Sequence, residues 1–224
     1  MVKTLRIFSI SLVLACSTQD VFGFWFYGGD WDFRSFLESG RNSTLEDARI
    51  YENFELSGPL QVTVVLGNFA LDGGLPTELY YEFRQNVAPG SGGDLLASGT
   101  VGAAAEMTGR SGFGFTEWSV SGNIPMLQLT PGQHWFTVTP VGNGAGHFYL
   151  TTTDGHNGVG SPLGDGNSYY DSDTLGADFD PTSDWLGKGL WDFSQGIDNI
   201  PEPATFLATL AGLGLLVFRK RRRA

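Results

Sequence analysis

The sequence predicts an all-β protein, an antiparallel β-sandwich or jelly roll, with an N-terminal signal peptide and one short C-terminal transmembrane helix. Through the middle of the 224-residue chain, short stretches of alternating apolar and polar residues are separated by clusters of Gly, Pro, Asn and Asp. Few stretches carry an apolar stripe of helical length. Apolar residues make up 41% of the chain and aromatic residues 13%, which is enough for a packed core and excludes wholesale disorder.

Residues 1–23 have the order of charge and hydropathy that is typical of a signal peptide. A short basic start precedes the apolar run Ile7–Ala15, and small or polar residues follow. This run is too short to cross a bilayer, which takes about 20 helical residues. Cleavage fits at Ala15-Cys16-Ser17 or at Val21-Phe22-Gly23, and lipidation of Cys16 is a further alternative.

Residues 24–199 are expected to form one exported β-sandwich domain. Its clearest half-buried strand is Glu78–Arg84, in which Leu79, Tyr81 and Phe83 alternate with Glu78, Glu82 and Arg84. The other candidate strands are Ile50–Leu56, Leu60–Leu66, Leu95–Val101, Phe113–Val120, Met126–Leu129, Trp135–Val141 and His147–Thr152, with a final strand or extended segment in Asp184–Asn199.

The domain between the two ends is strongly acidic. The whole chain has a formal net charge of −11, but its basic residues gather at the termini. Between Phe24 and Ile200, six basic residues accompany 22 acidic ones, which gives this part a net charge of −16. Such a charge makes a poor nucleic-acid binder, so no nucleic-acid partner is expected. The single Cys excludes a disulfide framework and a Cys-based zinc site.

Residues 200–224 contain three parts in a definite order. Pro201-Glu202-Pro203 comes first, an uncharged hydrophobic segment spans 204–218, and the basic cluster Arg219, Lys220, Arg221, Arg222 and Arg223 closes the chain. The segment predicts a helix about 22 Å long, so it needs snorkelling or local thinning to span the ~30 Å hydrocarbon layer. The basic cluster should stay cytoplasmic and leave the domain outside.

This tail resembles the PEP-CTERM sorting signal, which is found in exported proteins of Gram-negative bacteria that make exopolysaccharide. The resemblance covers residues 200–224. It implies recognition by an exosortase, a membrane cysteine protease or transpeptidase that cuts at or near Pro201-Glu202-Pro203. The helix would then hold the protein transiently in the inner membrane, before the protein reaches the envelope surface or the extracellular space.

Segments of the domain are similar to passenger domains often found ahead of such a tail. Tyr51–Leu56 is similar to their opening strand, and Tyr80–Val87 with Gly92–Gly99 resembles a recurrent strand–loop–strand unit. Leu129–Trp135 resembles the turn before a late strand. The resemblance supports a sandwich, but it implies no particular ligand or activity.

Aspartates crowd the last third of the domain, with the densest runs at Asp165-Gly166-Asn167 and Asp171-Ser172-Asp173. Such loops can supply the oxygen ligands that calcium prefers, but neither run keeps the spacing of a twelve-residue calcium loop. Asp also caps turns without a metal, so we predict no cofactor and keep calcium binding as an alternative.

Sugar binding is a further alternative for this domain, because exposed aromatic rings can serve as stacking platforms. Most aromatic residues in strands nevertheless belong to a core. The candidate platforms are Trp118, Trp135, Tyr149, Tyr169 and Tyr170.

No catalytic motif is recognisable in the chain. The only histidines are His134, His147 and His156, and none stands in a metal-ligand pair at helical spacing. No Ser lies in a Gly-x-Ser-x-Gly elbow. We therefore expect that the protein is not an enzyme.

The expected function is that of an exported, C-terminally anchored envelope or extracellular-matrix protein, structural or adhesive, sorted by an exosortase. Its expected partners are the exosortase, the inner membrane and exopolysaccharide. The alternatives are a carbohydrate- or calcium-binding β-sandwich module and a secreted hydrolase.

Overall fold

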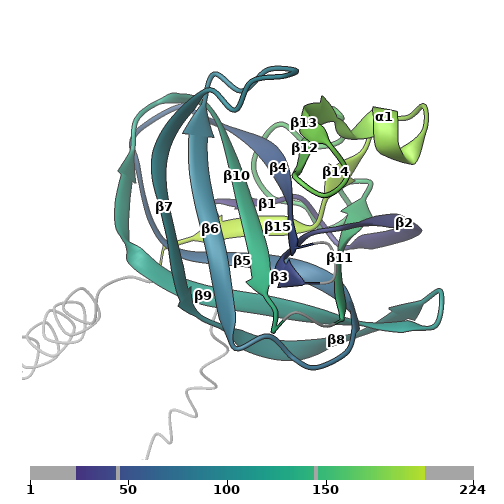
Figure 1. Ribbon diagram of the computed structural model, residues 1–224. Coiled ribbons are helices and arrows are strands. Elements are labelled where there is room, and N and C mark those ends of the chain that lie inside the picture. The colour runs from purple at the N-terminus through teal and green to yellow at the C-terminus, as the bar shows by residue number, and fades with distance from the viewer. Residues whose placement is uncertain (1–23, 44–45, 144–145, 200–224) are drawn as a thin grey trace, which may run out of the picture.

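The computed structural model describes residues 24–43, 46–143 and 146–199, which form two curled β-sheets around one apolar core (Figure 1). The all-β prediction is confirmed, and the architecture is sandwich-like. Within the described residues, the short α1 (Thr182–Leu186) is the only helix.

The first sheet is built around the long strand β5 (Leu60–Asp72). One edge of β5 pairs with β9 (Phe115–Leu129), and the other pairs with β15 (Gln195–Asp198) and then with β11 (His147–Thr153). The outer strands of this sheet are β1 (Phe26–Tyr27), β2 (Trp31–Glu38), β8 (Ala104–Gly112) and β14 (Asp192–Phe193). β15 therefore lies between β1 and β5, antiparallel to both.

The second sheet contains the remaining strands of the described chain. In spatial order they are β13 (Ala177–Pro181), β12 (Tyr169–Ser172), β4 (Glu46–Leu56), β3 (Gly40–Ser43), β10 (Gly132–Val141), β6 (Glu78–Gln85) and β7 (Asp94–Gly102). Strand pairing in both sheets is antiparallel, as predicted, except for one parallel pair in which Val141 of β10 lies opposite Arg41 of β3.

Aromatic rings from both sheets meet in the core. Phe26 of the first sheet lies edge-on to Phe136, with ring centroids 5.9 Å apart, and 5.7 Å from Phe54. These side chains are almost fully buried, so apolar area removed from water, at about 25 cal/mol per Å², is the main stabilising term between the sheets.

Polar side chains also join the two sheets through the core. Gln195 of β15 accepts a hydrogen bond from the backbone N–H of Val138 (2.8 Å) and donates one to the carbonyl of Ile50 (3.1 Å). The pairing of β4 with β10 ends at Glu52 and Phe136, so the strand residues just beyond need other partners. The amide of Gln195 supplies two of them.

Most of the predicted strands are present, and two predictions need correction. Phe113–Val120 and Met126–Leu129 belong to one continuous strand, β9, except for Phe113 and Gly114 at the preceding turn. Asp184–Asn199 is not one strand, because it contains the end of α1 and the short strands β14 and β15. The sequence patterns did not reveal β1, β2, β3, β8, β12 or β13.

Candidate functional site

The residues predicted to direct sorting lie outside the described part of the chain. They are Pro201, Glu202 and Pro203 and the basic cluster Arg219, Lys220, Arg221, Arg222 and Arg223, and the predicted signal peptide at 1–23 lies outside as well. Among the residues that the structure describes, no helix has the length and apolar character needed to cross a membrane.

Three carboxylates converge where the loop after β11 meets β4 and β14. Glu52 of β4, Asp165 of the loop and Asp192 of β14 each present an oxygen within 4.8 Å of the other two. Glu52 and Asp192 are 1% and 3% exposed, whereas Asp165 is exposed, so the cluster opens to solvent on the loop side. We call these three residues the acidic cluster.

Backbone N–H groups hold the acidic cluster in place. Asp192 accepts hydrogen bonds from the amides of Gly166 (2.7 Å) and Gly164, which fixes the loop over β14. Glu52 accepts one from the amide of Phe193 (2.8 Å) and so reaches from the second sheet to the first. Burial, and then the nearby charge of Asp192, raises the pKa of Glu52 well above 4.5. Burial also raises the pKa of Asp192.

Asn53 lies beside the acidic cluster and has an incomplete set of hydrogen bonds. Its amide Nδ2 donates to Asp165 Oδ2 at 3.1 Å, which places the carboxamide against the cluster. The residue is fully buried, and its Oδ1 has no hydrogen-bond partner. An unpaired buried carbonyl oxygen costs about 1–3 kcal/mol, so it calls for an explanation.

Only one residue of the acidic cluster belongs to a run that the sequence marked as a candidate calcium loop. Asp165 belongs to the run Asp165-Gly166-Asn167, but Glu52 and Asp192 come from distant strands that only the fold brings together. The second acidic run is used differently, because Asp171 pairs with Arg49 at 3.0 Å. Asp173 is exposed and is not part of the acidic cluster.

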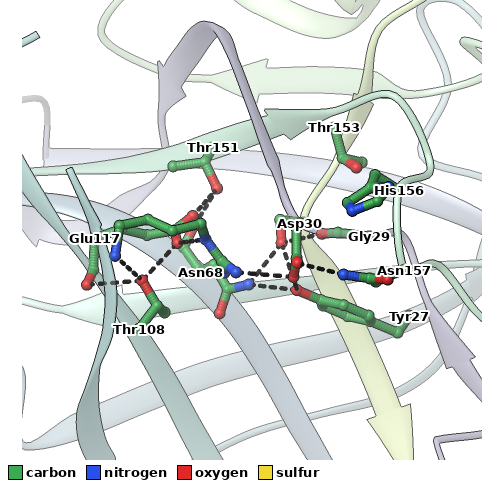
Figure 2. A network of polar contacts seen from close by, with 12 residues as sticks. Tyr27, Gly29, Asp30, Asn68, Thr108, Glu117, Thr151, Thr153, His156 and Asn157 are labelled. Carbon is green, nitrogen blue, oxygen red and sulfur yellow. Dashed lines mark hydrogen bonds and ion pairs between the residues drawn. The ribbon is translucent and has the colours of Figure 1, made fainter. Parts of the chain in front are cut away.

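A second polar group joins the β8–β9 hairpin to the N-terminal segment (Figure 2). Glu117 of β9 is fully buried and accepts hydrogen bonds from Thr151 (2.8 Å), Thr108 (2.8 Å) and Arg110 (2.5 Å). Arg110 also pairs with Asp30 at 2.9 Å. The arginine therefore neutralises one carboxylate on each side of the contact.

Asn68 lies at the centre of this network, and Figure 2 shows it between Glu117 and Tyr27. Its Nδ2 donates to Tyr27 Oη and to Ser194 Oγ, both at 2.7 Å. Burial raises the pKa of Tyr27 to about 12. Burial opposes the charge on Asp30, but hydrogen bonds from Asn157 and Tyr27 and the charge of Arg110 outweigh it and lower the pKa of this carboxyl. At neutral pH the pair is a fixed phenol donor and carboxylate acceptor, which indicates a structural contact rather than proton transfer.

A group of aromatic rings covers the outer side of β2, β11 and the turn of the β8–β9 hairpin. Trp31 is buried, with Phe33 stacked on it (centroids 4.8 Å apart) and Phe113 at 6.1 Å. Phe36 lies 5.6 Å from Phe113 and 4.7 Å from Tyr149. We call these rings, together with Phe115, the aromatic surface.

The two most exposed rings of the aromatic surface lie on strained backbone. Phe33 is 48% exposed with a φ of 58°, and Phe113 is 61% exposed with a φ of 55°. The left-handed region is unfavourable for bulky side chains, by about 1 kcal/mol or more. Strain that presents apolar rings to solvent points to a binding surface.

Of the five predicted sugar platforms, only Tyr149 belongs to the aromatic surface. Trp135 and Tyr170 are buried, and Trp118 is partly buried against the core. Tyr169 is half-buried beside Trp135. Phe33 and Phe113 could not be recognised as exposed rings from the sequence, because each lies on left-handed backbone that no alternating pattern marks.

The chain matches no protein-family model, no curated protein and no solved structure.

Two of the three histidines form side-chain hydrogen bonds, and His156 forms hydrogen bonds through its backbone. His134 Nε2 lies 2.8 Å from the carbonyl of Thr130, and burial lowers the pKa of this imidazole. His147 Nδ1 lies 2.6 Å from Glu38 Oε2. The acidic cluster offers cation ligands, and the aromatic surface offers exposed rings.

Proposed function

We propose that this is an exported, non-catalytic β-sandwich protein that an exosortase sorts to the envelope surface or the extracellular matrix. The observation that carries the proposal is the order of Pro201-Glu202-Pro203, the uncharged segment 204–218 and the basic cluster 219–223. Such a segment inserts in the inner membrane, and the basic cluster resists translocation. The sorting motif is therefore held at the external surface of the inner membrane. The sorted domain has a structural or adhesive role.

Exopolysaccharide is the proposed partner of the sorted domain. The aromatic surface favours this ligand, because flat exposed rings pack on the C–H faces of sugar rings without requiring a charge on the ligand. The net charge of −16 across the domain disfavours anionic partners by comparison. A neutral polysaccharide is therefore the ligand class that fits both observations.

The sorting proposal can be tested by changing the motif in the native host. Replacing Glu202 with Ala should block tail processing and leave full-length protein in the inner membrane, while Thr205→Ala should be processed normally. Intact mass and terminal peptide mapping of both fractions provide the measurement. Release of Glu202→Ala with an unchanged C-terminus would count against recognition by an exosortase.

Deletion of residues 204–224 provides a complementary test of the anchor. The truncated protein should leave the membrane fraction, because the segment proposed to hold it has been removed. Retention that persists in the deletion and disappears on adding Cys16→Ser would assign the anchor to a lipid on Cys16 instead.

The adhesive proposal can be tested by removing the two exposed rings. Phe33→Ser with Phe113→Ser should weaken cosedimentation with neutral exopolysaccharide by about 5- to 150-fold, since each ring contact is worth about 0.5–1.5 kcal/mol. Met126→Ser is the matched control, because Met126 is 59% exposed and lies outside the aromatic surface. Equal binding by the double variant and the control would contradict the proposal.

A further inference from the structure

Within the described residues, the acidic cluster differs from most other buried carboxylates in having no cationic partner; Asp198, which is 3% exposed, also has none, but it lies outside the cluster. Glu82 pairs with Arg49 and Arg84, Glu117 pairs with Arg110, and Asp171 pairs with Arg49. Neither Glu52, Asp165 nor Asp192 forms an ion pair with a described Lys, Arg or His. Burying carboxylates together without a counter-charge is unfavourable, so this position must take up either a proton or a cation.

The unpaired oxygen of Asn53 is independent support for a ligand at this position. Its carboxamide is fully buried and lies against Asp165, but its Oδ1 has no partner. A half-turn of the amide would exchange Oδ1 with Nδ2 and place an oxygen about 3 Å from Asp165 Oδ2. Two acceptors that close repel each other unless a cation lies between them. In that orientation a bound cation would pair with Oδ1 and supply the missing counter-charge, while Nδ2 takes the place where Oδ1 has no partner.

We propose that Glu52, Asp165, Asp192 and Asn53 Oδ1 form a calcium site that fastens the loop after β11 to both sheets. Oxygen ligands of one Ca²⁺, each about 2.4 Å from the ion, lie at most about 4.8 Å apart. The carboxylate oxygens of the acidic cluster lie within that separation. The donor set contains neither nitrogen nor sulfur, which favours a hard cation over zinc.

Calcium fits this site better than magnesium because the ligands come from three separate segments. Glu52 belongs to β4, Asp192 to β14 and Asp165 to a loop, so no single rigid element fixes the three ligand positions. Mg²⁺ demands a near-octahedral set at about 2.0–2.1 Å, whereas Ca²⁺ accepts irregular sets at longer distances. Waters on the exposed side of Asp165 would complete the shell. The site is independent of the sorting and adhesion proposals.

The first test is thermal unfolding of the full chain in mild detergent, after removal of divalent ions with EDTA. Addition of CaCl₂ to about 100 times the dissociation constant should raise the Tm by roughly 5–10 °C. NaCl at matched ionic strength and MgCl₂ are the controls, since general screening of an acidic domain also stabilises it. A response to either salt equal to that with CaCl₂ would overturn the calcium assignment.

The variant Glu52→Gln separates metal binding from a purely structural role. It should lose the calcium-dependent rise in Tm, yet its Tm in EDTA should equal or exceed that of the wild type, because a buried like charge is gone. Asp173→Asn is the matched control and should keep the full calcium response. If Glu52→Gln keeps that response, the site is not at the acidic cluster. If Glu52→Gln loses stability in EDTA by as much as it loses in calcium, its role is structural.

Terbium luminescence gives a direct reading that does not depend on unfolding. Tb³⁺ replaces Ca²⁺ at oxygen sites and emits when a nearby indole is excited. Trp191 precedes Asp192, and Trp135 Nε1 donates to the carbonyl of Asn167 at 3.3 Å, so two indoles lie close to the site. Sensitised emission that calcium displaces, and that Asp192→Asn abolishes, is the expected result. Emission that persists unchanged in Asp192→Asn would refute the assignment.

Discussion

Single side chains on the second sheet show how this protein stabilises a buried charge. Glu82 of β6 is 2% exposed, yet Arg84 (2.6 Å), Arg49 (3.1 Å), Tyr51 (2.8 Å) and Tyr80 all donate to its carboxylate. Burial opposes the charge, but these hydrogen bonds and the neighbouring arginines outweigh it and lower the pKa of Glu82 below 4.5. The carboxylate is therefore stabilised by folding.

The lowered pKa gives Glu82 a defined pH signature. Its contribution to stability is fully present above the unfolded pKa of about 4.5 and is lost as the pH falls through the lower folded pKa. Glu82→Gln should cost about 1–3 kcal/mol at pH 7 and progressively less below pH 4.5. Urea unfolding across the pH range measures this difference.

Glu78 provides the control for this experiment, because it is exposed at the start of the same strand. Glu78→Gln should leave the free energy of unfolding at pH 7 nearly unchanged, because this side chain is exposed. If the difference in free energy of unfolding between Glu82→Gln and the wild type stays constant from pH 7 to pH 3, the fold does not stabilise the charged carboxylate.

Among the elements, β7 and β9 approach most closely where the edges of the two sheets meet. A Cβ on Gly122 of β9 would lie 2.7 Å from Val101 Cγ2 and 3.2 Å from the carbonyl oxygen of Gly102. Gly122 is buried, and no larger residue fits without separating the strands. This position therefore closes one side of the sandwich.

Substitution of Gly122 should open that side of the sandwich. Gly122→Ala is expected to destabilise the protein by about 1–3 kcal/mol through overpacking. Gly102→Ala, on the facing strand, should be tolerated because nothing lies within 4 Å of the added Cβ. Thermal unfolding of the two variants compares the same chemical change in two environments. Equal Tm values would disprove the close approach.

A strand could be predicted from the sequence where apolar residues alternate regularly with polar ones. In β6 the apolar residues Leu79, Tyr81 and Phe83 stand at every second position, so the sequence predicted its bounds within one residue, although Glu82 on the other face is buried too. The strand β8, AAEMTGRSG, is half-exposed and rich in small residues, and no period-two pattern marks it. In β4 the residues 50–54 are all buried, because Tyr51 packs under Phe179 on the outer face of the sheet. A period-two pattern assumes that only one face of a strand is buried, so it could not predict the burial of Tyr51 on the other face.

At the scale of the whole molecule, the acidic cluster depends on topology rather than on local sequence. The density of aspartates around Asp165 suggested calcium, but the partners Glu52 and Asp192 come from different sheets. No local spacing encodes that meeting, which arises when β14 and the loop after β11 fold over β4. The same holds for the aromatic surface, where β2 and the β8–β9 turn meet only in the folded protein.

The position of β15 also has a mechanical consequence. The strand ends one residue before Asn199, the last described residue, and it is hydrogen-bonded to β1 on one side and to β5 on the other. A pull applied at Asn199 acts along β15, so the bonds on both edges are loaded in shear and must fail together instead of peeling one after another. The cross-sheet bonds of Gln195 add resistance from the opposite sheet. The domain is thus built to bear tension at its C-terminal end.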